Sequence, residues 1–482
     1  MSKDLLLEIG TEEIPAHYMP SILSQIKDLA HKKLDEANIS YESIRSLGTP
    51  RRVALLVSGV AEKQSDVSAK NKGPSVKIAY DSEGNPTKAA MGFARGQKIA
   101  VEDLVVEDGY VYANVTTVGK DTAGLLPDIL KDIILSLSFP KSMIWGDQTV
   151  HFVRPLRWFV ALFGTDVVPF EIAKVKSGRI SRGHRFLGTG DFEIPSMKDY
   201  ESVTREHFLI VDPEERKQMI LQGMQKLADE KGGTIIMDED LLEEVVFLVE
   251  YPTALCGEFD REFLQLPEAA IITPMKDHQR YFPMRDKDGK LMNLFLTVRN
   301  GDDYHLETVQ HGNERVLRAR LDDAKFFFEE DKKKKLIDRV DDLQHIVFQD
   351  GLGTLKDKAQ RLEQITTFLN HKLDLGLDDG DLTRLSDLAK TDLLTQMVAE
   401  FTELQGVMGR EYAMTAKSRK SPMLSMNSIC PVLPVMNCLR RRWAKSWALP
   451  ISSIPSPVRS AWVLSRRVPR TPLPCAARLS VS

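Results

Sequence analysis

The acidic residues of this chain stop abruptly, and that break constrains its folding more than any other feature. Glu411 is the last Asp or Glu, and the 71 residues from Tyr412 to Ser482 contain none. If acids make up about half of the roughly 25% charged residues of ordinary domains, such a gap has odds on the order of one in ten thousand. The sequence therefore has two compositionally different parts.

The two parts also differ in net charge and in proline content. Twelve of the 65 Lys and Arg residues lie between Lys417 and Arg478, so the C-terminal part is +12, whereas residues 1–415 keep 53 basic residues (65 − 12) against 69 acidic ones, or −16. The C-terminal part holds nine of the 24 prolines, which oppose helix and sheet interiors. We expect residues 414–482 to be a basic Pro/Ser/Arg-rich tail that is disordered or poorly packed. The alternative is a nucleic-acid-binding arm, with Arg440, Arg441 and Arg442 beside Trp443 and Trp447.

Cysteine use and hydrophobicity indicate a cytoplasmic protein. Cys256 is the only cysteine before residue 416, which argues against a disulfide framework and for a reducing compartment. The apolar run near the N-terminus is cut by Glu8 and is too short for a signal peptide. No stretch approaches the ~20 apolar residues that a membrane span needs. A chain of 482 residues predicts about two to four domains.

Strands and helices alternate in the first part of the chain, with no internal repeat. Short buried strands are predicted at residues 5–10 and 49–60, with an amphipathic helix at 22–34 between them. A turn at 84–86 precedes a short helix.

The next predicted elements are two helices and a hairpin. Asp212 is a predicted N-cap, followed by Pro213 at the first helical position. A helix at 240–250 should end before a proline. Strands at 279–285 and 291–298 should form the hairpin.

Beyond His311 the pattern is helical almost without interruption. One helical stripe is predicted to be core: Leu317, Leu321, Ala324 and Phe328. On the polar side, Glu314 and Arg318 are spaced to form an i,i+4 pair. The predicted fold class is thus an α+β N-terminal part of mixed sheets and helices, residues 1–330, followed by an all-α part, residues 331–413.

Motifs for catalysis on a phosphate or a metal are absent from the sequence. There is no phosphate-binding glycine loop, no dinucleotide fingerprint and no Cys or His pair at metal spacing. Two of the three carboxylates Glu8, Glu12 and Glu13 could act together as a general acid and a general base. The preferred interpretation is that Thr11 is an N-cap and that Glu12 and Glu13 favour the positive end of the following helix. We predict neither catalytic residues nor metal ligands.

Three basic clusters are the candidate binding residues, since phosphate recognition uses Lys and Arg. Phe186 or Tyr281 could add stacking on an unpaired base, and Gly178, Gly183 and Gly188 could let a nucleic-acid backbone approach. The alternative is that each arginine forms a salt bridge on the surface of an acidic protein. The predicted roles are phosphate neutralisation, with the histidines as hydrogen-bond donors or stacking surfaces. The first cluster is Arg51 and Arg52, the second is Arg179, Arg182, His184 and Arg185, and the third is Lys276, His278 and Arg280.

A series of motifs carries a specific resemblance. Their order and spacing from Leu5 to Ala413, about 85% of the chain, closely resemble the beta subunit of bacterial heterotetrameric glycyl-tRNA synthetase. The motifs are LLLEIGTEEIPA, TPRR, GPS, GNPTKAAMGFARG, FPKSMIWGD, FVRPLRW, SRGHRFLG, VEYPTALCGEFD, LPEAAIITPMKDHQRYFP, GNERVLRARLDDAKFFFEED and AEFTELQGVMGREYA.

The resemblance implies a division of labour between two kinds of subunit. In the family, the alpha subunit carries the class II active site that uses ATP, Mg²⁺ and glycine, and the beta subunit recognises tRNA(Gly) in an assembly of two alpha and two beta. It also implies a helical domain similar to HD-type phosphohydrolases, incomplete here. Where an active hydrolase has adjacent His and Asp ligands, this chain has Lys390 and Thr391 before Asp392, which disfavours metal hydrolysis.

The family resemblance stops at Met414, close to where the acids stop. A reading-frame shift would produce both breaks, and this is our hypothesis for the tail. Two alternatives to the beta-subunit function stay open: a free-standing HD-type metal-dependent phosphohydrolase, and an inactive truncated product.

Overall fold

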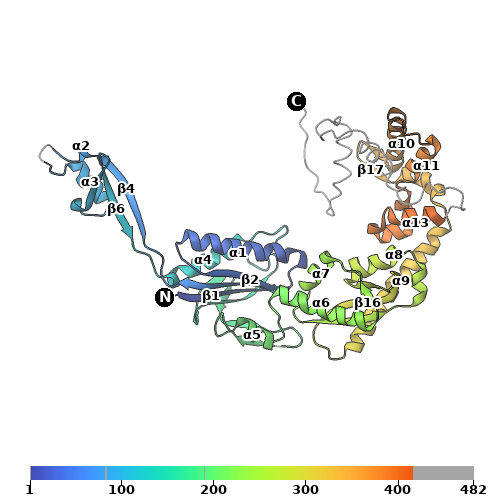
Figure 1. Cartoon of the computed structure of the whole chain (residues 1–482), viewed down its shortest axis with the longest axis horizontal. Helices are drawn as coiled ribbons and strands as arrows, with labels where there is room; N and C mark the ends of the chain where they lie inside the picture. Colours follow the sequence, from blue (N-terminus) through green and yellow to red (C-terminus); the bar gives the residue numbers. More distant parts are fainter. Residues whose placement is uncertain (1, 82–83, 189, 416–482) are drawn as a thin grey trace. The chain divides into compact units, whose positions relative to one another are not determined.

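The computed structural model describes residues 2–81, 84–188 and 190–415, and the chain divides into two compact units (Figure 1). The first unit ends at Asp323 and the second begins at Ala324. The predicted tail lies outside the described residues from residue 416 onward.

The main sheet of the first unit has seven strands. Its strand β1 is apolar on both faces, so the sheet has a hydrophobic core on each side. Leu5 and Leu7 pack into one core with helices α1 (Met19–Glu36) and α4 (Thr122–Ser136), whereas Leu6 packs into a second core with α5 (Tyr200–Glu206). Figure 1 shows α1 and α5 on opposite faces of this sheet. The strand order is β2-β3-β1-β7-β10-β9, with β8 paired to β7, and all pairs are antiparallel except β7 and β10. The bounds are β1 (Ser2–Thr11), β2 (Ser43–Thr49), β3 (Arg52–Ala61), β7 (Leu156–Phe163), β8 (Asp166–Val167), β9 (Glu171–Ile172) and β10 (Val175–Gly178).

The predicted strand at 49–60 is confirmed as β3 from Arg52 onward, but its first three residues belong to the end of β2 and a turn. Thr49 ends β2 and pairs with Arg52 at the start of β3, so Pro50 and Arg51 form the tight turn of a hairpin. The proline fixes this turn because its ring pre-sets the backbone and removes a ladder donor. The prediction for β1 is confirmed, and so is that for α1.

A smaller sheet has its own core. Its order is β4-β6-β5, with β4 (Val67–Ser75), β5 (Leu104–Glu107) and β6 (Tyr110–Thr117). Helices α2 (Val76–Ala79) and α3 (Lys88–Gln97) pack on it. The predicted turn before α3 is present, and Gly84 there has a φ of +82°, which glycine adopts readily.

A four-stranded sheet completes the first unit. Its order is β13-β15-β16-β14, with β13 (Thr234–Ile235), β14 (Pro252–Glu258), β15 (Phe282–Arg285) and β16 (Leu291–Asn300). Helix α6 (Pro213–Glu230) packs on β14, and α7 (Glu239–Val246) and α8 (Glu268–Thr273) belong to the same region. As predicted, Asp212 caps α6, with its carboxylate accepting from the Glu214 N–H at 2.9 Å.

Two predicted boundaries in this region are wrong. Helix α7 ends at Val246 rather than at 250, because the Phe247 N–H already bonds to the Glu244 carbonyl in a tightened last turn. Strand β15 begins at Phe282 rather than at 279, because residues Pro274–His278 form a π-helical turn and Arg280 takes a left-handed φ of +61°.

The second unit is mainly helical. Helix α9 (Leu306–Lys332) crosses the boundary in sequence, and its predicted core stripe is buried from Leu317 to Phe328. The helices that follow are α10 (Leu355–Lys372), α11 (Asp379–Leu388), α12 (Gln396–Glu400) and α13 (Val407–Thr415). A short antiparallel pair, β17 (Val347–Gln349) and β18 (Gly353–Thr354), departs from the all-helical prediction.

Two further observations concern the helices. The predicted Glu314–Arg318 pair is wrong, because Arg318 pairs with Asp260 at 3.2 Å. Across residues 2–81, 84–188 and 190–415, no helix has the length and apolar character needed to cross a membrane.

Candidate functional site

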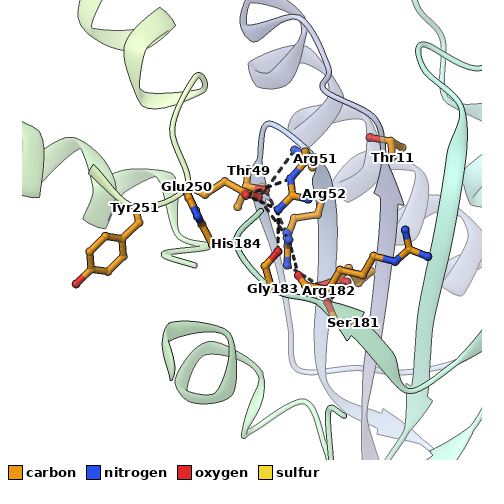
Figure 2. A network of polar contacts seen from close by, with 12 residues as sticks. Thr11, Thr49, Arg51, Arg52, Ser181, Arg182, Gly183, His184, Glu250 and Tyr251 are labelled. Carbon is orange, nitrogen blue, oxygen red and sulfur yellow. Dashed lines mark hydrogen bonds and ion pairs between the residues drawn. The ribbon is translucent and has the colours of Figure 1, made fainter. Parts of the chain in front are cut away.

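The first basic cluster lies in a buried network of charges in the first unit, drawn in Figure 2. Arg52 opens strand β3 and is fully buried, and Arg51 in the preceding turn is only 8% exposed. Two carboxylates in the network balance these guanidinium groups, Glu8 from β1 and Glu250 from the segment before β14. Buried charges persist only when they are paired and hydrogen-bonded, so the two arginines are structural partners of these acids.

Glu250 ties the β2–β3 turn to the start of β14. One of its oxygens accepts from the Thr49 hydroxyl at 2.8 Å, and the other accepts from Arg51 Nη2 at 2.6 Å. Arg52 Nη2 lies 3.4 Å from the carboxylate. Burial opposes ionisation of Glu250, but the Arg52 and Arg51 charges outweigh it and hold the pKa of this carboxyl below its usual value.

Glu8 occupies the other end of the network. It accepts from the Tyr200 hydroxyl at 2.6 Å and from the Trp158 indole and Ser181 hydroxyl, and Arg52 Nη1 lies 3.9 Å away. Burial and the Glu8 charge raise the pKa of Tyr200 well above its ordinary value. Because every contact of the Glu8 carboxylate faces the core, the acid–base alternative for Glu8 has no open site to act on.

The predicted role of Thr11 as a helix N-cap is wrong. Thr11 ends β1, and α1 begins only at Met19. Glu12 pairs with Arg157 at 2.6 Å and with Arg185 at 3.4 Å, and Glu13 pairs with Arg185 at 3.2 Å.

The buried arginines hold the backbone of a surface loop, residues 182–188. Arg51 Nη2 donates to the Gly183 carbonyl at 2.9 Å, and Arg52 Nη2 donates to the Arg182 carbonyl at 2.9 Å. The loop also packs on itself: a Cβ on Gly183 would lie 1.7 Å from the Gly188 carbonyl oxygen. These glycines are therefore needed for the loop's own packing, and the expectation that they admit a nucleic-acid backbone is not required to explain them.

His184 fixes the loop from inside. The side chain is 1% exposed, its Nε2 lies 3.0 Å from the Asn300 amide oxygen, and its Nδ1 accepts from the backbone N–H groups of Phe186 and Leu187 at 3.3 and 3.2 Å. Burial lowers the pKa of His184, and these partners suit the neutral ring with its proton on Nε2. His184 is thus a hydrogen-bond donor within the protein rather than a stacking surface.

The remaining residues of the second cluster reach the surface. Arg182 lies over the Trp158 ring at 5.2 Å and 3.5 Å from Asp191, and its side chain is about half exposed. Arg185 is equally exposed beside Glu12 and Glu13. Arg179 donates to the Thr165 carbonyl at 2.8 Å. Phe186, at the tip of the same loop, is 76% exposed.

The third cluster contacts helix α7 and its N-cap residue, Asp238. Lys276 bonds to Asp238, and Arg280 Nε lies 2.9 Å from Glu244. His278 is half-buried at the end of the π-helical turn. Tyr281 is 4% exposed and stacks on Phe295 at 4.6 Å, so the prediction that it could stack on a base is wrong.

Several residues of the site escaped the sequence analysis. Glu250 stands at the end of an apolar run, VVFLVE, and Glu8, a candidate only for acid–base chemistry in the sequence analysis, stands in LLLEIG; an acid inside an apolar run is the available signal of a buried carboxylate. Asn300 and Tyr200 had no such signal. Arg216 donates to three backbone carbonyls, and burial lowers its pKa to about 10. Within the described ranges, no three His, Cys, Asp or Glu side chains gather where they could hold a metal ion.

The residues exposed on the loop indicate the kind of ligand that it could bind. A loop that carries exposed arginines and a phenylalanine, fixed from below by buried charges, is suited to binding an anionic ligand. The family model described as Glycyl-tRNA synthetase beta subunit matches residues 5–427, and the chain belongs to this family. The match ends 14 residues beyond the expected limit at residue 413.

Curated relatives agree with the family. The chain is 48% identical over 418 residues to the Glycine--tRNA ligase beta subunit of Desulfitobacterium hafniense (strain DSM 10664 / DCB-2), covering 86% of this chain and 60% of that relative. It is 47% identical over 419 residues to the protein of the same name from Bacillus subtilis (strain 168), covering 86% of this chain and 61% of the relative. The chain therefore spans about 60% of the length of these relatives.

Proposed function

We propose that this chain acts as the beta subunit of a glycine–tRNA ligase in the cytoplasm. It binds tRNA(Gly) so that an alpha subunit carries out ATP-dependent glycylation, in an assembly of two alpha and two beta subunits. ATP and Mg²⁺ are used by the alpha subunit, and this chain holds no cofactor of its own. Family membership and the names of relatives at 47–48% identity support this proposal.

The observation that carries the proposal is the loop 182–188. Its backbone carbonyls are fixed by Arg51 and Arg52, while the side chains of Arg182 and Arg185 stay about half exposed. Exposed ion pairs contribute only about 0–1 kcal/mol, so these two arginines can exchange their carboxylate partners for phosphates at little cost. Arg51 and Arg52 act in this proposal as positioning residues.

The other predicted residues keep more limited roles. Arg179, Lys276, His278 and Arg280 are proposed contacts to tRNA or to the alpha subunit. Residues 331–413 are proposed to be an incomplete HD-like helical domain. The phosphohydrolase alternative is not favoured, because Lys390 and Thr391 precede Asp392 where an active hydrolase has adjacent His and Asp ligands.

Reconstitution tests the proposal. The chain, the alpha subunit of Bacillus subtilis and tRNA(Gly) are assayed for glycylation together and separately, with the full-length Bacillus subtilis beta subunit as positive control. We expect glycylation above the level of alpha alone only in the mixture, and weaker than with the longer beta subunit. Failure to bind tRNA and to raise glycylation, or formation of glycyl adenylate by this chain alone, would contradict the proposal.

A further inference from the structure

We propose that three aromatic side chains beside the loop take up unpaired RNA bases, so that this face binds a single-stranded segment of the tRNA. The aromatic strip consists of Phe186, Phe208 and Tyr251. The inference rests on the proposed function and names the part of the substrate that this face recognises.

Phe186 is the most exposed member of the strip. Its ring is 76% exposed at the tip of an ordered loop, so its faces are accessible to a ligand. The His184 ring lies 6.2 Å away and accepts from the Phe186 backbone N–H. The buried histidine therefore fixes the Phe186 backbone, while the faces of the Phe186 ring are exposed to solvent.

Phe208 lies next to the loop in a strained conformation. The carbonyl of His207 accepts from the His184 N–H at 3.1 Å, and the His207 ring stacks on Phe192 at 4.0 Å. Phe208 itself has a φ of +59°, which is rare for a bulky side chain. Backbone strain of this kind concentrates at binding sites, where the surrounding structure holds a side chain in place.

Tyr251 extends the strip from the other side. Its ring lies edge-on to Phe208, with centroids 5.4 Å apart, and Figure 2 shows it pointing away from the charged network. The Asn300 amide oxygen accepts from the Tyr251 N–H at 3.2 Å and also bonds to His184. The Asn300 side chain thus links the Tyr251 backbone to His184, which in turn accepts from the Phe186 backbone N–H.

The charges beside the strip favour RNA over an apolar protein partner. Arg182 and Arg185 precede Phe186 on the same loop and are about half exposed, and their ion pairs, to Asp191 and to Glu12 and Glu13, lie at the surface, where phosphates can replace the carboxylates. In an RNA duplex the base faces are already stacked, whereas unpaired bases stack on protein aromatics. The combination of cations with the exposed Phe186 ring and the half-buried rings of Phe208 and Tyr251 therefore fits a single strand.

Binding of short RNAs to the full chain tests the inference. The probes are the single-stranded 3′ end of tRNA(Gly), its anticodon loop, and a blunt acceptor-stem duplex; the first two separate the possible sources of an unpaired segment. We expect Phe186→Ala to weaken binding of at least one single-stranded probe by about 5- to 150-fold and to leave duplex binding unchanged. Phe368→Ala is the matched control, since this phenylalanine on α10 is 63% exposed, and it should have no effect.

A spectroscopic readout keeps the test independent of folding. Phe186→Trp should bind the same probe and lose tryptophan fluorescence on binding, because a stacked base quenches the indole. If wild-type chain binds tRNA(Gly) while Phe186→Ala binds both single-stranded probes as tightly as wild type and Phe186→Trp shows no quenching with either, the inference is overturned and the proposed function stands. Loss of alpha-subunit binding alone would make the strip a protein contact and would also overturn it. If wild-type chain neither binds tRNA nor supports glycylation, the proposed function fails first.

Discussion

Two pairs of arginines in this molecule have the same chemistry and opposite environments. Arg51 and Arg52 lie in the core against Glu250 and Glu8, whereas Arg182 and Arg185 lie half exposed on a loop. The inner pair donates to the carbonyls of Arg182 and Gly183, so it supports the segment that carries the outer pair. One set of charges therefore fixes the shape of the loop from the core, and another set lies on the loop's surface.

The two pairs should differ in energy as well as in role. Breaking a buried ion pair leaves an uncompensated charge in a low-dielectric interior and costs about 3–5 kcal/mol. An exposed pair contributes about 0–1 kcal/mol. Substitutions that separate stability from binding therefore test the difference between the two pairs.

The largest effect is expected from Glu250→Gln. The glutamine keeps the shape of the side chain but leaves Arg51 without its carboxylate partner in the network and Arg52 with Glu8 alone, at 3.9 Å. We expect a loss of about 3–5 kcal/mol in the free energy of unfolding, measured by urea denaturation at neutral pH. Glu12→Gln on the surface is the matched control and should change stability by less than about 1 kcal/mol. Equal effects of the two substitutions would remove the distinction between inner and outer pairs.

A smaller, pH-dependent effect is expected at His184. Because burial holds its pKa below 6.5, the unfolded chain takes up this proton first as the pH falls. The stability that His184 contributes should be complete above about pH 6.5 and decrease as the pH falls toward the folded-state pKa. His184→Gln should cost about 1–3 kcal/mol at pH 7.5 by leaving buried partners unsatisfied. The difference between wild type and this variant should shrink at pH 5.5; a constant difference would mean that the histidine does not titrate in this window.

The smallest effect is expected at the outer pair. A double-mutant cycle with Glu12→Gln and Arg185→Gln should give a coupling free energy of about 0.2–1 kcal/mol that decreases with added salt. A coupling of several kcal/mol, insensitive to salt, would show that Arg185 is committed to its carboxylates and not free for phosphate.

Much of the scaffold could be predicted from local pattern. The apolar run of β1, the 3.6-residue spacing of α1 and the N-cap Asp212 each depend on neighbours in sequence, and each was predicted correctly. The tight turn at Pro50 was missed because an apolar stretch with a leading proline fits one strand as well as the end of a hairpin.

The division between inner and outer arginines could not be predicted. Arg51 and its partner Glu250 are 199 residues apart, so no local pattern reveals that the charge is neutralised in the core. The same limit applies to Asn300, which reaches His184 across 116 residues. In the second cluster, Arg179, Arg182 and Arg185 lie at the surface, which is where a basic cluster is expected.

The most direct test of the account is the salt dependence of tRNA(Gly) binding by the chain with and without the outer pair. For Arg182→Ala combined with Arg185→Ala, the slope of log affinity against log salt should fall by about two, with the free energy of unfolding nearly unchanged. The combined Lys176→Ala and Lys198→Ala variant, which removes two cations from the same unit outside the loop, should leave the slope as it is. An unchanged slope and affinity for the arginine variant would contradict the claim that buried charges hold this loop for an RNA phosphate backbone.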